Sequence, residues 1–143
     1  YQGIEISLQI WDTAGQEQYR SLGPMYYRKG KAGIAVFDLT NKKSLDDLDD
    51  WIETYRRNAE DPFILIVGNK KDLEDSIQFE WDYIQEWAHN RNANCIWTSA
   101  KTNEGIDDIF NLAIQHIVES KPSEDDNTQV IPADQCVSAN SCC

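Results

Sequence analysis

The chain has 143 residues, a length typical of one domain. Hydrophobic residues make up 41% and charged residues 27%, as in globular proteins, and the net charge of −12 argues against nucleic acid as a partner, because phosphates need a basic face. We expect neither a transmembrane helix nor a signal peptide in these residues, since no apolar run approaches ~18 residues and no basic-then-apolar pattern opens the chain.

Four segments have the pattern of β-strands. Residues 4–11 alternate apolar and polar side chains, which predicts a strand buried on one face. Residues 32–39 and 63–68 are continuous apolar runs bounded by turn residues, and 94–98 is a shorter one. Such runs are typical of strands that are covered on both faces of a parallel sheet.

Three stripes of apolar residues at helical spacing lie between and after these strands. We predict that all three face the core, and that Ser44 and Asp47 form a capping box at the start of the first. The start of the second lacks a Ser or Thr cap. The stripes are Leu45, Leu48, Trp51, Ile52 and Tyr55; Trp81, Ile84, Trp87 and Ala88; and Ile106, Ile109, Phe110, Ala113, Ile114 and Ile117.

The alternation of strands and helices predicts an α/β fold with a largely parallel sheet and helices on both faces. We assign residues 1–120 to this domain. Residues 121–143 are polar, acidic and without period, and we expect a disordered tail there. Cys95 lies in an apolar run and is predicted to be a small buried hydrophobic residue.

Polar clusters directly follow three of the predicted strands, at residues 12–17, 69–72 and 99–101. In a parallel sheet the carboxyl ends of the strands share one edge, and ligands bind there. One such cluster is explained by the preference of turns for Asp and Gly. Three on one rim predict a binding site.

These clusters read DxxGQ, NKxD and SAK in chain order, which resembles the guanine-nucleotide-binding motifs of the Ras superfamily of small GTPases. The segments WDTAGQE and YYR and the terminal Cys-Cys are similar to the Rab family, and SLGPMYYR to its endocytic members. The resemblance extends from residue 4 to about residue 119. It implies a P-loop-NTPase-type three-layer α/β/α fold.

By the same resemblance, the protein binds GTP and GDP with Mg²⁺ and hydrolyses GTP as a switch in vesicle-mediated, endosomal membrane traffic. Its implied partners are exchange factors, GTPase-activating proteins, effectors, Rab escort protein and GDP-dissociation inhibitor. The implied location is the cytoplasmic face of endosomal, vesicular or plasma membranes, in exchange with the cytosol.

The predicted base site takes residues from the two later clusters and Leu73: Asn69, Lys70, Asp72, Leu73, Ser99, Ala100 and Lys101. A carboxylate at Asp72 can accept both the N1–H and the exocyclic amine of guanine, whereas adenine would leave it unpaired. We expect Asn69 to brace the loop and the stem of Lys70 to cover the ring face. The backbone N–H of Ala100 could donate to the guanine oxygen, with Ser99 and Lys101 holding that loop.

The first cluster forms the predicted phosphate site, which comprises Asp12, Thr13, Ala14, Gly15 and Gln16. Asp12 is expected to hold Mg²⁺ through water. Gly15 lets a backbone N–H approach a γ-phosphate, and Gln16 is the predicted catalytic residue, which orients the attacking water.

Two exposed aromatic residues are implied by the resemblance to belong to the effector surface. They are Trp11 and Tyr26, for which ordinary packing is the alternative interpretation.

The phosphate-binding motif GxxxxGK[ST] does not occur in the 143 residues. The family places it upstream, with a first strand and a first helix. We therefore expect a fragment that folds poorly alone, with open apolar strand edges, and binds nucleotide weakly. The alternative is a truncated, non-enzymatic interaction module that does not bind nucleotide stably.

The last two residues, Cys142 and Cys143, resemble the double-geranylgeranylation signal of Rab proteins. Two lipids are expected to be needed, because one chain anchors only marginally and the tail has no polybasic patch. Free thiols are the alternative, and Cys136 is expected to stay unmodified.

Overall fold

The computed structural model describes residues 1–3, 5–13, 27–60 and 62–120. Its centre is a three-stranded parallel sheet in the order β1-β2-β3. The strands are β1 (Ala32–Asp38), β2 (Phe63–Asn69) and β3 (Asn94–Trp97), which confirms the three apolar runs as strands.

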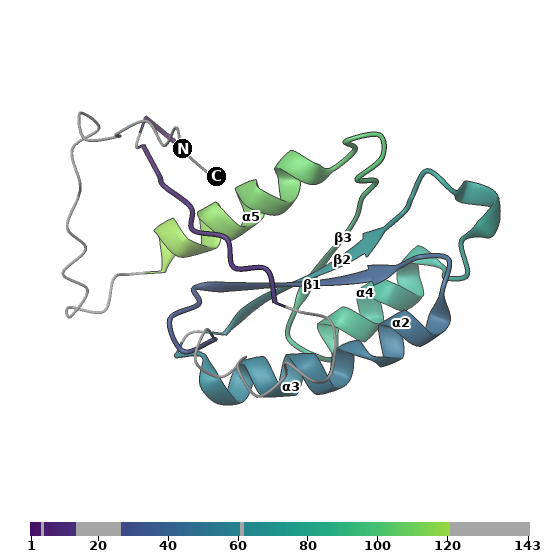
Figure 1. Cartoon of the computed structure of the whole chain (residues 1–143), viewed down its shortest axis with the longest axis horizontal. Helices are drawn as coiled ribbons and strands as arrows, with labels where there is room; N and C mark the ends of the chain where they lie inside the picture. The colour runs from purple at the N-terminus through teal and green to yellow at the C-terminus, as the bar shows by residue number, and fades with distance from the viewer. Residues whose placement is uncertain (4, 14–26, 61, 121–143) are drawn as a thin grey trace, which may run out of the picture.

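Helices cover both faces of this sheet (Figure 1). On one face lie α2 (Lys42–Asp46), α3 (Leu48–Asn58) and α4 (Trp81–His89), and on the other lies α5 (Ile106–Glu119). A short 3₁₀ helix, η2 (Glu74–Ser76), follows β2. The predicted α/β class and parallel sheet are confirmed. The three stripes are helical, but the first is divided between α2 and α3, and Trp81 of the second, which was predicted to face the core, is exposed.

The central strand β2 is buried on both faces because its side chains alternate between two apolar clusters. Ile64 and Ile66 belong to the cluster that includes Ile52 of α3 and Ile84 of α4. Leu65 and Val67 pack in the second cluster, which includes Ile109 of α5. A continuous apolar run is therefore what this position requires.

The predicted capping box at Ser44 is wrong. The first helix begins one turn earlier, where the Asn41 side chain caps it by accepting a hydrogen bond from the backbone N–H of Lys43 (3.1 Å). Asn is as good an N-cap as Ser, and the choice depends on where the preceding strand ends. Ser44 lies inside α2, where its Oγ accepts from the backbone N–H of Asp38 (2.9 Å).

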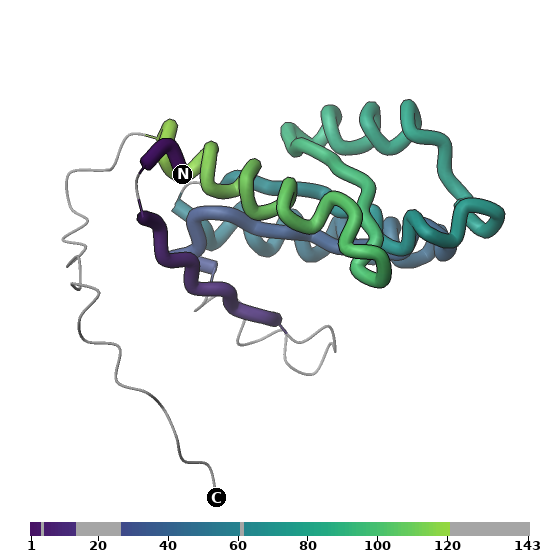
Figure 2. Tube along the Cα trace, turned by 90° about the horizontal axis from the view of Figure 1, so that it is seen from above, coloured from purple at the N-terminus to yellow at the C-terminus, as the bar shows by residue number. Residues whose placement is uncertain are grey.

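The predicted strand at residues 4–11 is also wrong. Residues 5–13 form no strand, and Ile10 and Trp11 are 70% and 65% exposed. A strand needs a hydrogen-bonded neighbour, and the resemblance to small GTPases implies that another strand lies between this segment and β1. Among the described residues nothing occupies that position, and the segment runs separately alongside the sheet (Figure 2).

Strand β1 is the edge of the sheet among the described residues. Ala35 and Phe37 are buried against the helices of one face, while Val36, which points to the opposite face, is 53% exposed. The expected open apolar edge is therefore present at β1. In β3, Cys95 is half-buried against the core, and this burial raises the pKa of its thiol.

Candidate nucleotide-binding site

The ends of β2 and β3 bring two of the predicted clusters together. Gly68 is paired with Trp97 in the parallel register. Beyond the strands, the backbone N–H of Thr98 donates to Gly68 O (2.8 Å) and that of Lys71 donates to Thr98 O (2.9 Å). The loops that follow the two strands therefore leave the sheet side by side.

The Asp72 carboxylate is held by the opposite loop. The buried Ser99 hydroxyl donates to Asp72 Oδ1 (2.6 Å), and the ammonium of Lys101 lies 3.5 Å from Oδ2. The hydrogen bond from Ser99 is the main cause that lowers the pKa of Asp72, with a contribution from Lys101. The carboxylate is thus a fixed, ionised acceptor at neutral pH.

Asn69 braces the same pair of loops. Its Oδ1 accepts a hydrogen bond from the backbone N–H of Ala100 (3.0 Å). The sequence analysis predicted that this N–H donates to the guanine oxygen instead. Because Ala100 has a single backbone N–H, a base oxygen at that position must share or replace the bond to Asn69.

Lys70 links the site to β1. Its backbone is in the left-handed region (φ +70°), and its Nζ lies 2.6 Å from Asp38 Oδ2. The backbone N–H and the hydroxyl of Thr40 donate to the other oxygen of Asp38 (2.8 and 2.7 Å). The hydrogen bond from Lys70 is the main cause that lowers the pKa of Asp38.

Sequence reasoning did not identify Asp38 as part of this site. A signal was nevertheless present, because Asp38 is a polar residue at the end of β1, as Asn69 is at the end of β2. The two residues are partners in the parallel register.

A pocket of about 350 Å³ lies between the two loops. Its volume falls at the lower end of the range of small-molecule sites. Its lining consists of six of the predicted base-site residues: Asn69, Lys70, Asp72, Leu73, Ala100 and Lys101. The structure therefore assembles the two later motifs into one concave site.

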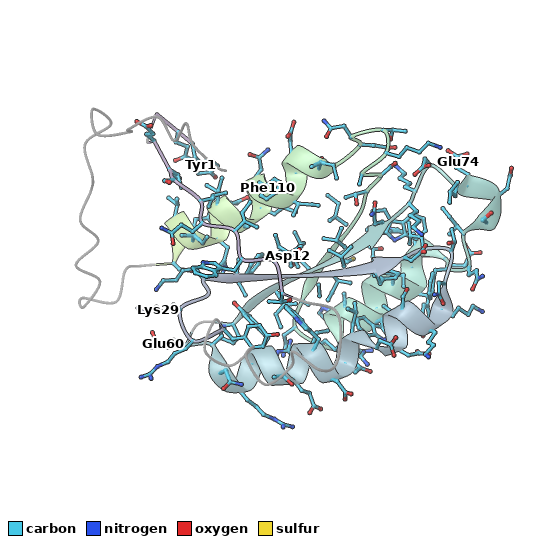
Figure 3. All side chains as sticks on the ribbon, viewed as in Figure 1. Tyr1, Asp12, Lys29, Glu60, Glu74 and Phe110 are labelled. Carbon is cyan, nitrogen blue, oxygen red and sulfur yellow. The ribbon has the colours of Figure 1, made fainter. Side chains whose placement is uncertain are left out.

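Of the first cluster, the structure describes only Asp12 and Thr13, and neither residue lines the pocket. Asp12 is exposed, and it lies far from Glu74, which follows the end of β2 (Figure 3). The expectation that Asp12 sits at the end of a buried strand is wrong, because that strand does not form.

Several predicted residues lie outside the described ones. They are Ala14, Gly15, Gln16, Tyr26, Cys136, Cys142 and Cys143, and with them the tail 121–143. Within the described ranges, no helix is long and apolar enough to cross a membrane.

A family model described as "Ras family" matches residues 1–119. Rab5A of Oryza sativa subsp. japonica, a Ras-related protein, is 32% identical in an alignment of 143 positions that covers 96% of this chain and 70% of that protein. RabJ of Dictyostelium discoideum is 39% identical over 110 residues, covering 76% of this chain and 43% of its own length. SEC4 of Candida albicans is 37% identical over 124 residues, 86% of this chain and 59% of the relative. The family match, these relatives and the α/β fold together show that the chain belongs to the Rab family of Ras-related small GTPases.

Proposed function

We propose that this chain carries the guanine-recognition part of a GTP- and GDP-binding switch protein. The observation that supports this most directly is the Asp72 carboxylate, which Ser99 and Lys101 hold at the pocket between the two loops. A carboxylate fixed in this way matches the adjacent N1–H and exocyclic amine of guanine, and adenine offers no such pair of donors.

Hydrolysis of GTP is proposed on the basis of family membership, with Gln16 orienting the attacking water. The segment after Gln16 is proposed to change conformation when the γ-phosphate is lost. Release of phosphate from GTP by the purified chain tests this part of the proposal.

Family membership also implies Mg²⁺, which binds together with the nucleotide and neutralises phosphate charge. The described residues do not by themselves fit such an ion. Asp12 is exposed and away from the pocket, and this part of the chain contains no group of three or more His, Cys, Asp or Glu side chains that could hold a metal. We therefore assign no step to Mg²⁺.

The cellular role is proposed by the same analogy to be control of vesicle traffic, including endosomal traffic. Exchange factors, GTPase-activating proteins, effectors, Rab escort protein and GDP-dissociation inhibitor are the proposed partners. Trp11, which is exposed, and Tyr26 are proposed to contribute to the effector surface. Geranylgeranyl groups on Cys142 and Cys143 are the proposed attachment to the cytoplasmic face of membranes.

A second candidate function is an interaction module that does not bind nucleotide stably. The position of Asp12 favours it, because Asp12 and Thr13, the described residues of the predicted phosphate site, do not line the pocket. Denaturing the purified chain and chromatographing the released small molecules separates the two functions. Stoichiometric GDP or GTP supports the switch, and a nucleotide-free protein that binds none on addition supports the module.

Base selectivity tests the role of Asp72. The affinities of GDP, xanthosine diphosphate and ADP are measured for the full chain and for Asp72→Asn. We expect the wild type to prefer GDP. In Asp72→Asn, the ratio of the affinity for xanthosine diphosphate to that for GDP should rise by about ten- to hundredfold over the wild-type ratio, since xanthine has a carbonyl in place of the amine.

The matched control is Asp75→Asn, because Asp75 is an exposed carboxylate in η2 that does not line the pocket. Each selectivity is a ratio measured on one sample, so a loss of folded protein lowers both affinities and leaves the ratio unchanged. An unaltered ratio in Asp72→Asn, or an equal change in Asp75→Asn, refutes the assignment.

A further inference from the structure

A second anchored side chain borders the pocket, and its anchor lies on a different strand. Lys70 lines the pocket, and its ammonium pairs with the carboxylate of Asp38 at the end of β1. The position of the stem is therefore determined at both ends, by the backbone at Asn69–Lys70 and by the ion pair at Asp38. We propose that Asp38 is a positioning residue for base binding, which acts by holding the Lys70 stem along the pocket.

Asp38 is itself rigidly placed. It is the last residue of β1 and faces Asn69 in the parallel register, which fixes its backbone beside the start of the binding loop. Its backbone N–H donates to the hydroxyl of Ser44, and Thr40 makes two hydrogen bonds to Oδ1. These bonds leave Oδ2 directed to Lys70 at 2.6 Å.

The side chain of Lys70 is long and starts from a turn of the backbone, so an anchor affects how it is ordered. The left-handed backbone conformation of Lys70 (φ +70°) turns the chain sharply between β2 and Asp72. A free lysine side chain with four rotatable bonds samples many rotamers, and a ligand that needs the stem in one position must order it. The ion pair with Asp38 does this ordering before the ligand binds.

The side chain of Lys70 is 51% exposed and that of Asp38 is 23% exposed, so the pair is screened by water and contributes little to stability. Its expected effect is on binding instead. Ordering one long side chain corresponds to about a two- to tenfold change in affinity.

The inference rests on the proposed function, and guanosine monophosphate serves as the probe. It is titrated into the ¹⁵N-labelled full chain, and the backbone amide signals of Leu73 and Ala100 are followed. We expect Asp38→Asn and Lys70→Met each to weaken binding about two- to tenfold. The double variant should bind no more weakly than Lys70→Met alone, because Asp38 acts through Lys70.

The neighbouring ion pair between Lys71 and Glu104 supplies matched controls. Glu104→Gln and Lys71→Met make the same charge changes beside the same two loops, yet neither residue lines the pocket. Both controls should bind the probe as the wild type does. Equal weakening in the controls would assign the effect to net charge and overturn the inference.

The remaining outcomes are distinct. A wild-type chain that does not bind the probe overturns the proposed function and this inference together. A wild type that binds, with Asp38→Asn unchanged, overturns this inference alone, as do additive losses in the double variant. If Asp38→Asn does not fold, Lys70→Met serves as the test, since this variant keeps the hydrogen bonds between Asp38 and Thr40. An unchanged affinity of Lys70→Met for guanosine monophosphate refutes the proposal.

Discussion

Gly68 links the packing of the core to the geometry of the candidate site. It lies at the end of β2, is paired with Trp97 of β3 and directly precedes the binding loop. A Cβ at this position would stand 2.7 Å from Cδ2 of Leu39 and 3.0 Å from Cδ1 of Trp97. Carbon atoms prefer separations of about 3.5–4.0 Å, so Gly68→Ala requires Leu39 to move by at least ~0.8 Å.

Leu39 has little room for such a movement, because it is fully buried in the core. We expect Gly68→Ala to destabilise the protein by about 1–3 kcal/mol through overpacking. The strand ends must also shift apart, which displaces Asp72 from Ser99, so the affinity for guanosine monophosphate should fall as well. Urea unfolding of the full chain and the same titration measure the two effects.

A double-mutant cycle identifies the cause. Leu39→Ala alone leaves a cavity and should cost about 2–5 kcal/mol. In Gly68→Ala/Leu39→Ala the new methyl group enters the space that the leucine leaves, so the double variant should lose about 1 kcal/mol less than the two single losses added together. Strict additivity, or a Gly68→Ala variant as stable as the wild type, would refute the steric explanation.

Two further predictions concern the loop after β3. Ser99→Ala removes the hydrogen bond that lowers the pKa of Asp72 below its ordinary value near 3.8. A lowered carboxyl pKa stabilises the folded state above the pKa of the unfolded state, and this contribution is lost as the pH falls through the pKa of the folded state. Ser99→Ala should therefore be less stable than wild type at pH 6, and the difference in the free energy of unfolding should shrink below about pH 4. A difference in urea unfolding that does not depend on pH would contradict this. The hydroxyl of Thr98 is buried and finds no hydrogen-bond partner among the described residues. Thr98→Val should therefore be neutral or stabilising by up to ~1 kcal/mol in the same assay, whereas a loss of more than ~1 kcal/mol would reveal a partner for the hydroxyl.

The apolar patterns determined much of the fold without reference to tertiary structure. Each of the three continuous runs became a strand, and β2, the central strand, is buried on both faces as such a run predicts. The spacing of Ile106, Ile109 and Ala113 predicted α5 for a similar reason, since one face of that helix must pack on the sheet. The motifs at residues 69–72 and 99–101 lie together because parallel strands end at one edge.

Tertiary structure decided the features that depend on neighbours distant in the sequence. The alternating pattern of residues 4–11 was sufficient for a strand only if a partner strand lay beside it, and none does among the described residues. The cap at Asn41 in place of Ser44 depends on where β1 ends. The contact of Lys70 with Asp38 depends on the register of β1 against β2, which no local pattern specifies, and for that reason Asp38 emerged only from the folded structure.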